Sequence, residues 1–281
     1  MAKLLLLLKR WPSLTLKMTV KTNNLLLIIL LYLLTGCGFS SGLYQDIISA
    51  HNHINEQKYS EAAEIYEKIL IKKPSKNIRI KINFQLGEIY SIYLGNYKKS
   101  IKHFETIVND SNEPLWQVKS LEKIGEIYFE NLNQYEKSKA IFYKLKNFVP
   151  PLKKQAQYTY KYALSVLNSK QYQEAIKELD AVIRLNNKEF SVLAYYYKGL
   201  AYYYKRDWEN AISQWNEYLR RETRADKITD TKFLIANAYE SSEKLKEAYD
   251  YYYSILGEYP NPDVIRNRLN TLYERRVSRK R

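Results

Sequence analysis

Few residues in this chain have side chains that could carry out chemistry. They are Cys37, which is the only cysteine, and three histidines, His51, His53 and His103. A single cysteine excludes an internal disulfide and a site built from several thiolates. His51 and His53 are two positions apart, so on a helix they point to different faces and do not share a metal as an i, i+4 pair does. The sequence also lacks a glycine-rich phosphate loop. We therefore expect no catalytic, metal or cofactor site and no enzyme activity, which leaves the thiol of Cys37 to be explained.

The position of Cys37 explains it. A continuous apolar run, Leu25 to Leu34, follows Lys17 and Lys21. Ten residues rise about 15 Å as a helix, roughly half of a bilayer core, so the run predicts the core of a signal peptide and not a spanning helix. Leu34-Thr35-Gly36-Cys37 comes next. This tetrad resembles the bacterial lipobox, which implies that the thiol of Cys37 is lipidated and that the chain is cut just before it.

This resemblance gives the expected organisation of the N-terminus. Residues 1–36 form a signal peptide, in which 1–17 is an upstream extension if Met18 is the true start, and residues 37–42 form a lipidated, flexible tether. In enteric-type bacteria an Asp after the lipidated Cys retains the protein in the inner membrane. Gly38 stands there instead. The resemblance therefore implies anchoring in the cell envelope, on the periplasmic side of the outer membrane, with inner-membrane retention as the alternative.

The rest of the chain repeats with a period of about 37 residues. Each repeat has two small residues, one in each of two predicted helices, and bulky apolar residues three or four positions away, which is the spacing of one helix face. The small residues of the second helices are Ala62, Ser100, Ser138, Ala175, Ala211 and Ala248. Those of the first helices are Ala50, Gly87, Gly125, Ala163, Gly199 and Ala236. A small residue lets a neighbouring helix approach closely, so each repeat is predicted to be a helical hairpin.

This pattern, with a closing proline at Pro74, Pro150 and Pro260, resembles the tetratricopeptide repeat. The resemblance covers residues 43–260 and implies an all-α, right-handed solenoid of about six hairpins. Residues 261–281 are predicted to form a basic capping helix and tail, because a solenoid needs a polar-faced end. Its outer face is expected to carry Arg266, Arg268, Arg275 and Arg276.

The tetratricopeptide resemblance also implies a partner surface. In such arrays the first helices line a concave groove that accepts an extended peptide or a helix. Tyr195 and Tyr202 fit core positions, so Tyr196 and Tyr203 are expected to face the groove, where tyrosine suits binding. The candidate groove residues are Ile47, Phe84, Phe129, Tyr160, Tyr196, Leu200, Tyr203 and Phe233. The alternative is that tyrosine only replaces Phe and Leu in the core.

Charge leaves several partners open. The chain holds 45 Lys and Arg against 30 Asp and Glu, a net charge of +15, which suits nucleic acid, anionic lipid or an acidic protein. Because the tyrosines recur at packing positions, we expect proteins as partners, a membrane contact through the lipid, and neither nucleic acid nor a small-molecule substrate. The expected function is a scaffold in an envelope complex, with resemblance to the BamD-type lipoprotein of outer-membrane β-barrel assembly. The alternatives are a pilotin-like, peptidoglycan-associated or cell-division lipoprotein and, in another class, a ligand-binding or enzymatic lipoprotein.

Overall fold

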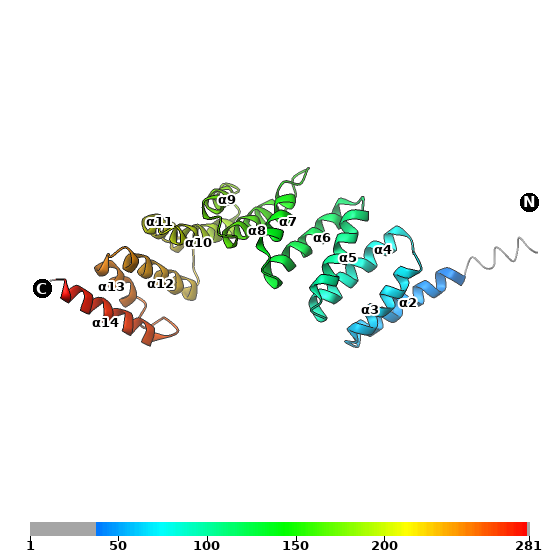
Figure 1. The fold of residues 1–281 in the computed structure, drawn as a ribbon, viewed down its shortest axis with the longest axis horizontal. Helices are drawn as coiled ribbons and strands as arrows, with labels where there is room; N and C mark the ends of the chain where they lie inside the picture. The colour runs from blue at the N-terminus through cyan, green and yellow to red at the C-terminus, as the bar shows by residue number, and fades with distance from the viewer. Residues whose placement is uncertain (1–37, 280–281) are drawn as a thin grey trace, which may run out of the picture. The chain divides into compact units, whose positions relative to one another are not determined.

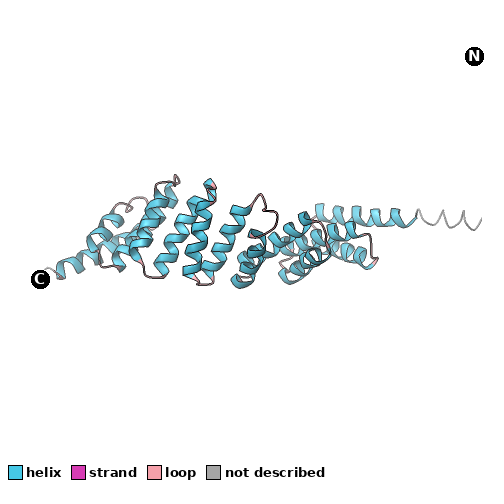
Figure 2. Cartoon of the chain, turned by 90° about the horizontal axis from the view of Figure 1, so that it is seen from above, coloured by secondary structure: helices cyan, strands magenta, loops and turns pink. Residues whose placement is uncertain are grey.

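The computed structural model describes residues 38–279, and all of its regular elements in this range are helices (Figures 1 and 2). Contacts divide the chain into two compact units, residues 1–79 and 80–281. The predicted signal peptide and Cys37 lie outside the described residues. Within those residues, no helix combines the length and the apolar character needed to cross a bilayer.

The first unit contributes one hairpin, made of α2 (Gly38–Asn55) and α3 (Tyr59–Ile71). The ammonium group of Lys72 lies 2.6 Å from the Asp46 carboxylate and ties the end of α3 to α2. α2 begins at Gly38 and so includes residues of the lipidated tether predicted over 37–42, which stays a prediction. Adding residues to an existing helix costs little compared with starting one, so even Ser and Gly join it here.

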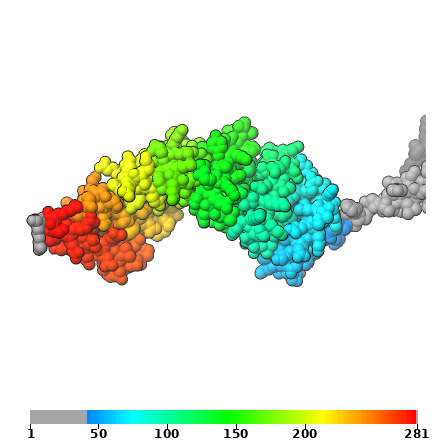
Figure 3. Space-filling view, viewed as in Figure 1, coloured from blue at the N-terminus to red at the C-terminus, as the bar shows by residue number. Residues whose placement is uncertain are grey.

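The second unit contains five more hairpins, and α4 enters it from the first unit. Successive helices pack on one another along the chain from α5 onwards, and the colours in Figure 3 follow the same order within this unit. The predicted all-α solenoid of about six hairpins with a C-terminal cap is therefore confirmed over residues 38–279. The elements are α4 (Lys76–Glu88), η1 (Ile89–Tyr93), α5 (Tyr97–Asp110), α6 (Pro114–Glu126), η2 (Ile127–Asn131), α7 (Tyr135–Lys146), α8 (Gln155–Asn168), α9 (Tyr172–Arg184), α10 (Lys188–Tyr204), α11 (Trp208–Leu219), α12 (Ala225–Ser241), α13 (Leu245–Tyr253) and α14 (Pro262–Ser278).

The small residues hold each hairpin together. All twelve are buried, and the bulky residue four positions after each second-helix small residue is at most 1% exposed. In α10 a methyl group at Gly199 would collide with the indole of Trp215. In α4 a methyl group at Gly87 would lie 2.5 Å from the ring of Phe104. The large ring of the second helix therefore sits directly on the backbone of the first.

The turn between the two helices of each hairpin is the same in all six hairpins of the described chain. The residue five positions before the second-helix small residue has a positive φ of 52–62°. Only Gly95 is a glycine; the other five are Gln57, Asn133, Lys170, Arg206 and Glu243. A left-handed residue ends the first helix and turns the chain back.

Two first helices end in a π-helical turn, η1 and η2. In these hairpins the small residues are 13 positions apart, from Gly87 to Ser100 and from Gly125 to Ser138, whereas the other four hairpins have 12. A π-turn is how an α-helix absorbs one inserted residue. The second-helix small residue is serine only in these two hairpins, and its hydroxyl donates to the glycine carbonyl that precedes the π-turn, at 2.7 Å for Ser100 and Gly87 and 3.2 Å for Ser138 and Gly125.

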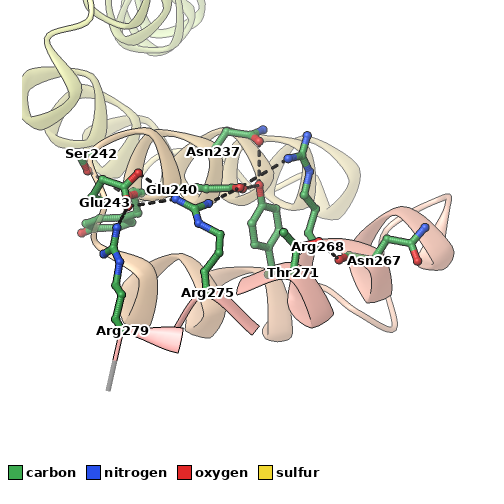
Figure 4. Close-up of polar contacts among 11 residues, drawn as sticks. Asn237, Glu240, Ser242, Glu243, Asn267, Arg268, Thr271, Arg275 and Arg279 are labelled. Carbon is green, nitrogen blue, oxygen red and sulfur yellow. Dashed lines mark hydrogen bonds and ion pairs between the residues drawn. The ribbon is translucent and has the colours of Figure 1, made fainter. Parts of the chain in front are cut away.

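The last helix, α14, closes the second unit. Ile265, Leu269 and Leu272 are buried in one cluster with Tyr252 and Ile255 of the last hairpin. Figure 4 shows Arg268 and Arg275 of α14, together with Arg279 directly after it, reaching Glu240 and Glu243 of α12. Arg275 lies 3.2 Å from Glu240 and 2.8 Å from Glu243, and Arg268 lies 3.5 Å from Glu240.

The prediction that Arg275 lies on the outer face of the cap is therefore wrong, whereas Arg268 remains exposed. Glu240 is largely buried, with its side chain 14% exposed, and a carboxylate removed from water needs a cationic partner. Arg266 and Arg276 do not reach α12: Arg266 pairs with Asp263 of its own helix at 2.7 Å.

Candidate protein-binding surface

The structure places most of the predicted groove residues against other side chains of the repeats. Phe84, Tyr160 and Phe233 lie three positions before a first-helix small residue, and Phe129 and Tyr203 lie four after one. Positions i, i+3, i+4 and i+7 share one helix face. These residues therefore lie on the helix face that packs within the hairpin. Their prediction as groove residues did not take this spacing into account. Ile47, three positions before Ala50, shares this register and is half-buried in α2.

Ring contacts confirm this packing. The ring centroids of Tyr203 and Trp215 are 5.7 Å apart, and those of Tyr196 and Tyr218 are 5.3 Å apart. Tyr160 is only 8% exposed and packs on Tyr197. Tyr196 and Tyr203 are thus half-buried among these rings, and their role in a groove stays a prediction. The remaining pairs are Phe84 with Phe104 and Trp116, Phe129 with Tyr135, and Phe233 with Tyr252 and Tyr259.

The positions that join one first helix to the next are different ones. From α4 to α12, they stand one position after the small residue of one first helix and two positions before the small residue of the next first helix. We call the eight residues at these positions the first-helix surface. Its members are Glu88, Lys123, Glu126, Lys161, Leu164, Tyr197, Leu200 and Leu234.

From α4 to α8 the first-helix surface is a ladder of ion pairs. Lys123 of α6 lies 3.1 Å from Glu88 of α4. Lys161 of α8 lies 2.8 Å from Glu126 of α6 and 3.6 Å from Glu130. Each pair is partly exposed and spans two repeats. These ion pairs were not predicted from the sequence, although Glu88–Lys123 and Glu126–Lys161 share one separation of 35 residues.

From α8 to α12 the same positions become apolar. Leu164 is buried in a cluster against which Tyr197 packs. Leu200 and Leu234 both pack on the cluster around Trp215. Tyr197, Leu200 and Leu234 remain half-exposed. Where the first repeats of this unit pair charges, these repeats have neighbouring apolar side chains that are only partly covered, as an interaction surface has.

Many tyrosine hydroxyls end on carboxylates. Tyr158 donates to Glu122 of the preceding first helix at 2.5 Å, and Tyr162 donates to Glu174 at 2.8 Å. Burial, and then the nearby carboxylate, raises the pKa of both hydroxyls. At neutral pH these groups are therefore protonated donors that fix adjacent helices, and they are not poised to act as bases.

The histidines are also structural. The Nδ1 atom of His53 lies 2.8 Å from the Ser49 carbonyl of its own helix. The ring of His103 stacks on Tyr90, and its Nδ1 lies 2.9 Å from Asn83 Oδ1. In residues 38–279 no three His, Cys, Asp or Glu side chains are grouped closely enough to hold a metal ion.

Comparisons with known proteins agree with the geometry. Tetratricopeptide-repeat family models match residues 160–227 and 80–109. The fold is similar to the C-terminal part of a TPR repeat-containing protein from Cytophaga hutchinsonii, with a TM-score of 0.65 and 16% identity over 89% of this chain and 96% of that one.

Two other solved structures are similar in fold. PilW, described as a widely conserved type IV pilus biogenesis factor, gives a TM-score of 0.52 at 17% identity, over 82% of this chain and 98% of that one. PilF of Pseudomonas aeruginosa gives 0.51 at 13% identity, over 85% and 99%. At such identities the likeness concerns the fold alone. No curated protein matches the chain.

Proposed function

We propose that this chain, built of tetratricopeptide repeats, is a protein-interaction scaffold held in a bacterial cell envelope by a lipid on Cys37. The observation that carries the proposal is the change along the first-helix surface from ion pairs to half-exposed apolar side chains. The three side chains Tyr197, Leu200 and Leu234 would hold apolar side chains of a partner peptide or helix. Burying such side chains contributes about 25 cal/mol per Å² of apolar area.

The envelope location rests on sequence alone. The apolar run Leu25–Leu34 and the tetrad ending at Cys37 support export and lipidation. Two or more acyl chains give stable anchoring. The periplasmic side of the outer membrane is the proposed site, because Gly38 and not Asp follows the cysteine.

Two partner classes fit such a scaffold. One is an outer-membrane barrel protein with polypeptide-transport domains, as expected for a BamD-like role. The other is a secretin or pilus component, and the likeness of the fold to PilW and PilF is a reason to test it. Recovery of one or the other from detergent-solubilised envelope distinguishes the two roles.

The apolar positions can be tested with a substitution that the chain itself provides. Leu200 and Leu234 stand where Glu126 and Lys161 stand in earlier repeats. The double variant Leu200→Glu, Leu234→Lys should therefore keep the fold, with an ion pair in place of the apolar pair. We expect its capture of the partner to fall at least about tenfold, the equivalent of 1.4 kcal/mol, measured by quantitative pull-down with the full chain as bait.

The matched control is the reverse exchange, Glu126→Leu with Lys161→Leu, which leaves the apolar positions intact. It should retain capture. Circular dichroism checks that both variants keep the helicity of the unchanged chain. If the first variant is folded and captures the partner as well as the unchanged chain does, the apolar part of the first-helix surface is not the binding site.

A further inference from the structure

A cavity of about 510 Å³ lies in the second unit, away from the first-helix surface. It is formed by α5, the end of η2 and the start of α7. Its lining residues are Lys98, Ile101, Lys102, Glu105, Tyr128, Leu132, Gln134 and Lys137. The volume is in the range of sites that take small molecules, and π-turns such as η2 are often found at functional sites.

Three ammonium groups and one carboxylate line this cavity. Lys98 and Lys102 are one turn apart on α5, so they share a face, and Lys137 lies in the first turn of α7. In residues 38–279 none of these three lysines forms an ion pair. Glu105 is the only acid in the lining, so the cavity holds an excess of two positive charges.

Part of the cavity lining is apolar. Ile101 is buried, and Leu132 is half-buried. The ring of Tyr128 lies beneath Lys137, whose Nζ is 5.2 Å from the ring centroid. The site therefore combines cations at its edge with an apolar and aromatic floor, which suits a ligand that has a charged end and an apolar body.

Packing does not require lysine at these three positions. The equivalent residues of the next repeat are Glu136, Ala140 and Glu174. Those of the two repeats after that are Gln173, Lys177 and Asn210, and then Glu209, Ser213 and Glu247. Later hairpins form with acidic residues at the equivalent positions. Packing therefore does not explain why three lysines line this cavity.

We propose that this cavity binds a dianionic phosphate group, as a phosphate monoester or diphosphate, carried on an apolar body. The charge of a dianion balances the excess of two positive charges, and lysine binds phosphate as a point charge without demanding the planar geometry that arginine needs. The phosphate can belong to a soluble compound or to a lipid headgroup. The proposal does not depend on the peptide-binding role of the first-helix surface.

The test is titration of the full chain, in a nonionic detergent, with phenyl phosphate and with inorganic phosphate, followed by calorimetry. Phenyl phosphate should bind more tightly, because its ring can reach the apolar floor. The triple variant Lys98→Gln, Lys102→Gln, Lys137→Gln should bind phenyl phosphate at least about tenfold more weakly. Glu105→Gln should bind it about two- to threefold more tightly, because the only repelling carboxylate is gone.

The control has the same loss of charge at lysines outside the cavity, Lys144→Gln, Lys170→Gln, Lys177→Gln, and should change binding less than about twofold. Flotation with vesicles of phosphatidylcholine, alone or mixed equally with phosphatidic acid, identifies the source. Binding of phenyl phosphate without vesicle capture indicates a soluble ligand, and vesicle capture that the cavity variant alone loses indicates a lipid. Equal loss in the two triple variants, or no binding of phenyl phosphate at millimolar concentration together with no capture by phosphatidic acid, overturns the proposal.

Discussion

At the scale of single residues, the contact between Gly199 and Trp215 decides how closely α10 and α11 approach. The indole lies on the helix backbone, and its Nε1 donates to the carbonyl of Tyr196 at 3.1 Å. This contact needs both a residue without a side chain and a large flat ring. The small residue was predictable from its periodic recurrence. The hydrogen bond was not, because an indole that fills a gap can face several carbonyls.

Gly199→Ala should therefore lower the free energy of unfolding, although alanine favours helix by about 1 kcal/mol. We expect a net loss of about 1–2 kcal/mol, because overpacking a core typically costs about 1–3 kcal/mol. Urea unfolding followed by circular dichroism measures it. Gly257 is the control, because a methyl group there meets nothing within 4 Å; Gly257→Ala should change stability by less than about 0.5 kcal/mol. Equal effects at the two glycines would contradict the close approach.

For the tyrosines, the sequence predicted burial but not the hydrogen-bond partners. Their recurrence at packing positions predicted burial, and Tyr66 and Tyr252 are indeed at most 1% exposed. The carboxylates that accept hydrogen bonds from Tyr158, Tyr162 and Tyr252 could not be predicted. Tyr158 and its acceptor Glu122 are 36 residues apart, so the pairing depends on how neighbouring hairpins are stacked.

At the scale of elements, each π-turn is linked to the serine of the second helix by a hydrogen bond. The extra residue between Gly87 and Ser100 shortens the regular part of α4, and the hydroxyl of Ser100 donates to the carbonyl of Gly87. A buried carbonyl needs such a donor. The change from 12 to 13 residues was visible in the sequence, and it predicts an insertion. What it could not predict is that the insertion lies inside the helix and not in the loop.

Deleting Ile92, which is 60% exposed in η1, should convert that turn to an ordinary α-helix. The hairpin would then have the spacing of 12 that the other four hairpins have, and we expect it to fold with the helicity of the unchanged chain. Deleting Asn168 from α8 is the control. It would leave only 11 positions between Ala163 and Ala175, in a hairpin that has no extra residue to lose, so it should abolish the cooperative thermal transition. Comparable loss in both deletions would show that the π-turn is not an absorbed insertion.

The first-helix surface was also only partly predicted from the sequence. The predicted set contained Leu200 and missed Tyr197 and Leu234, because positions on the packing stripe were counted as groove positions. A helical wheel centred on Gly199 separates the two groups. It cannot, however, tell that Glu126 and Lys161 meet, since their contact depends on how α6 and α8 lie together.

At the scale of the whole molecule, the chain combines an expected lipid anchor with an array that binds through its surface. The length and the repeat pattern were enough to predict the solenoid and its cap. The division into units at residues 79 and 80 has no signal in the sequence, because the repeat continues through it.

For the anchor, Cys37→Ser should move the protein from the membrane fraction to the soluble fraction, and an alkyne-labelled fatty acid should be incorporated only into the chain that has Cys37. Loss of the thiol removes the acyl chains that bind the bilayer. The control is Ser60→Ala, an exposed change in α3, which should leave fractionation unchanged. Membrane retention of the Cys37→Ser chain without the label would mean that Leu25–Leu34 remains uncleaved and holds it there.

The arginines of α14 also limit how this protein can lengthen during evolution. Glu240 and Glu243 of the last hairpin are committed to Arg275, and the apolar end of the array is covered by Leu269 and Leu272. A duplicated hairpin inserted directly after α14 would find the end of the last hairpin already covered. Copies inserted between existing hairpins would meet the repeating small residues on both sides, so duplication is open among the hairpins and closed where α14 covers the last one.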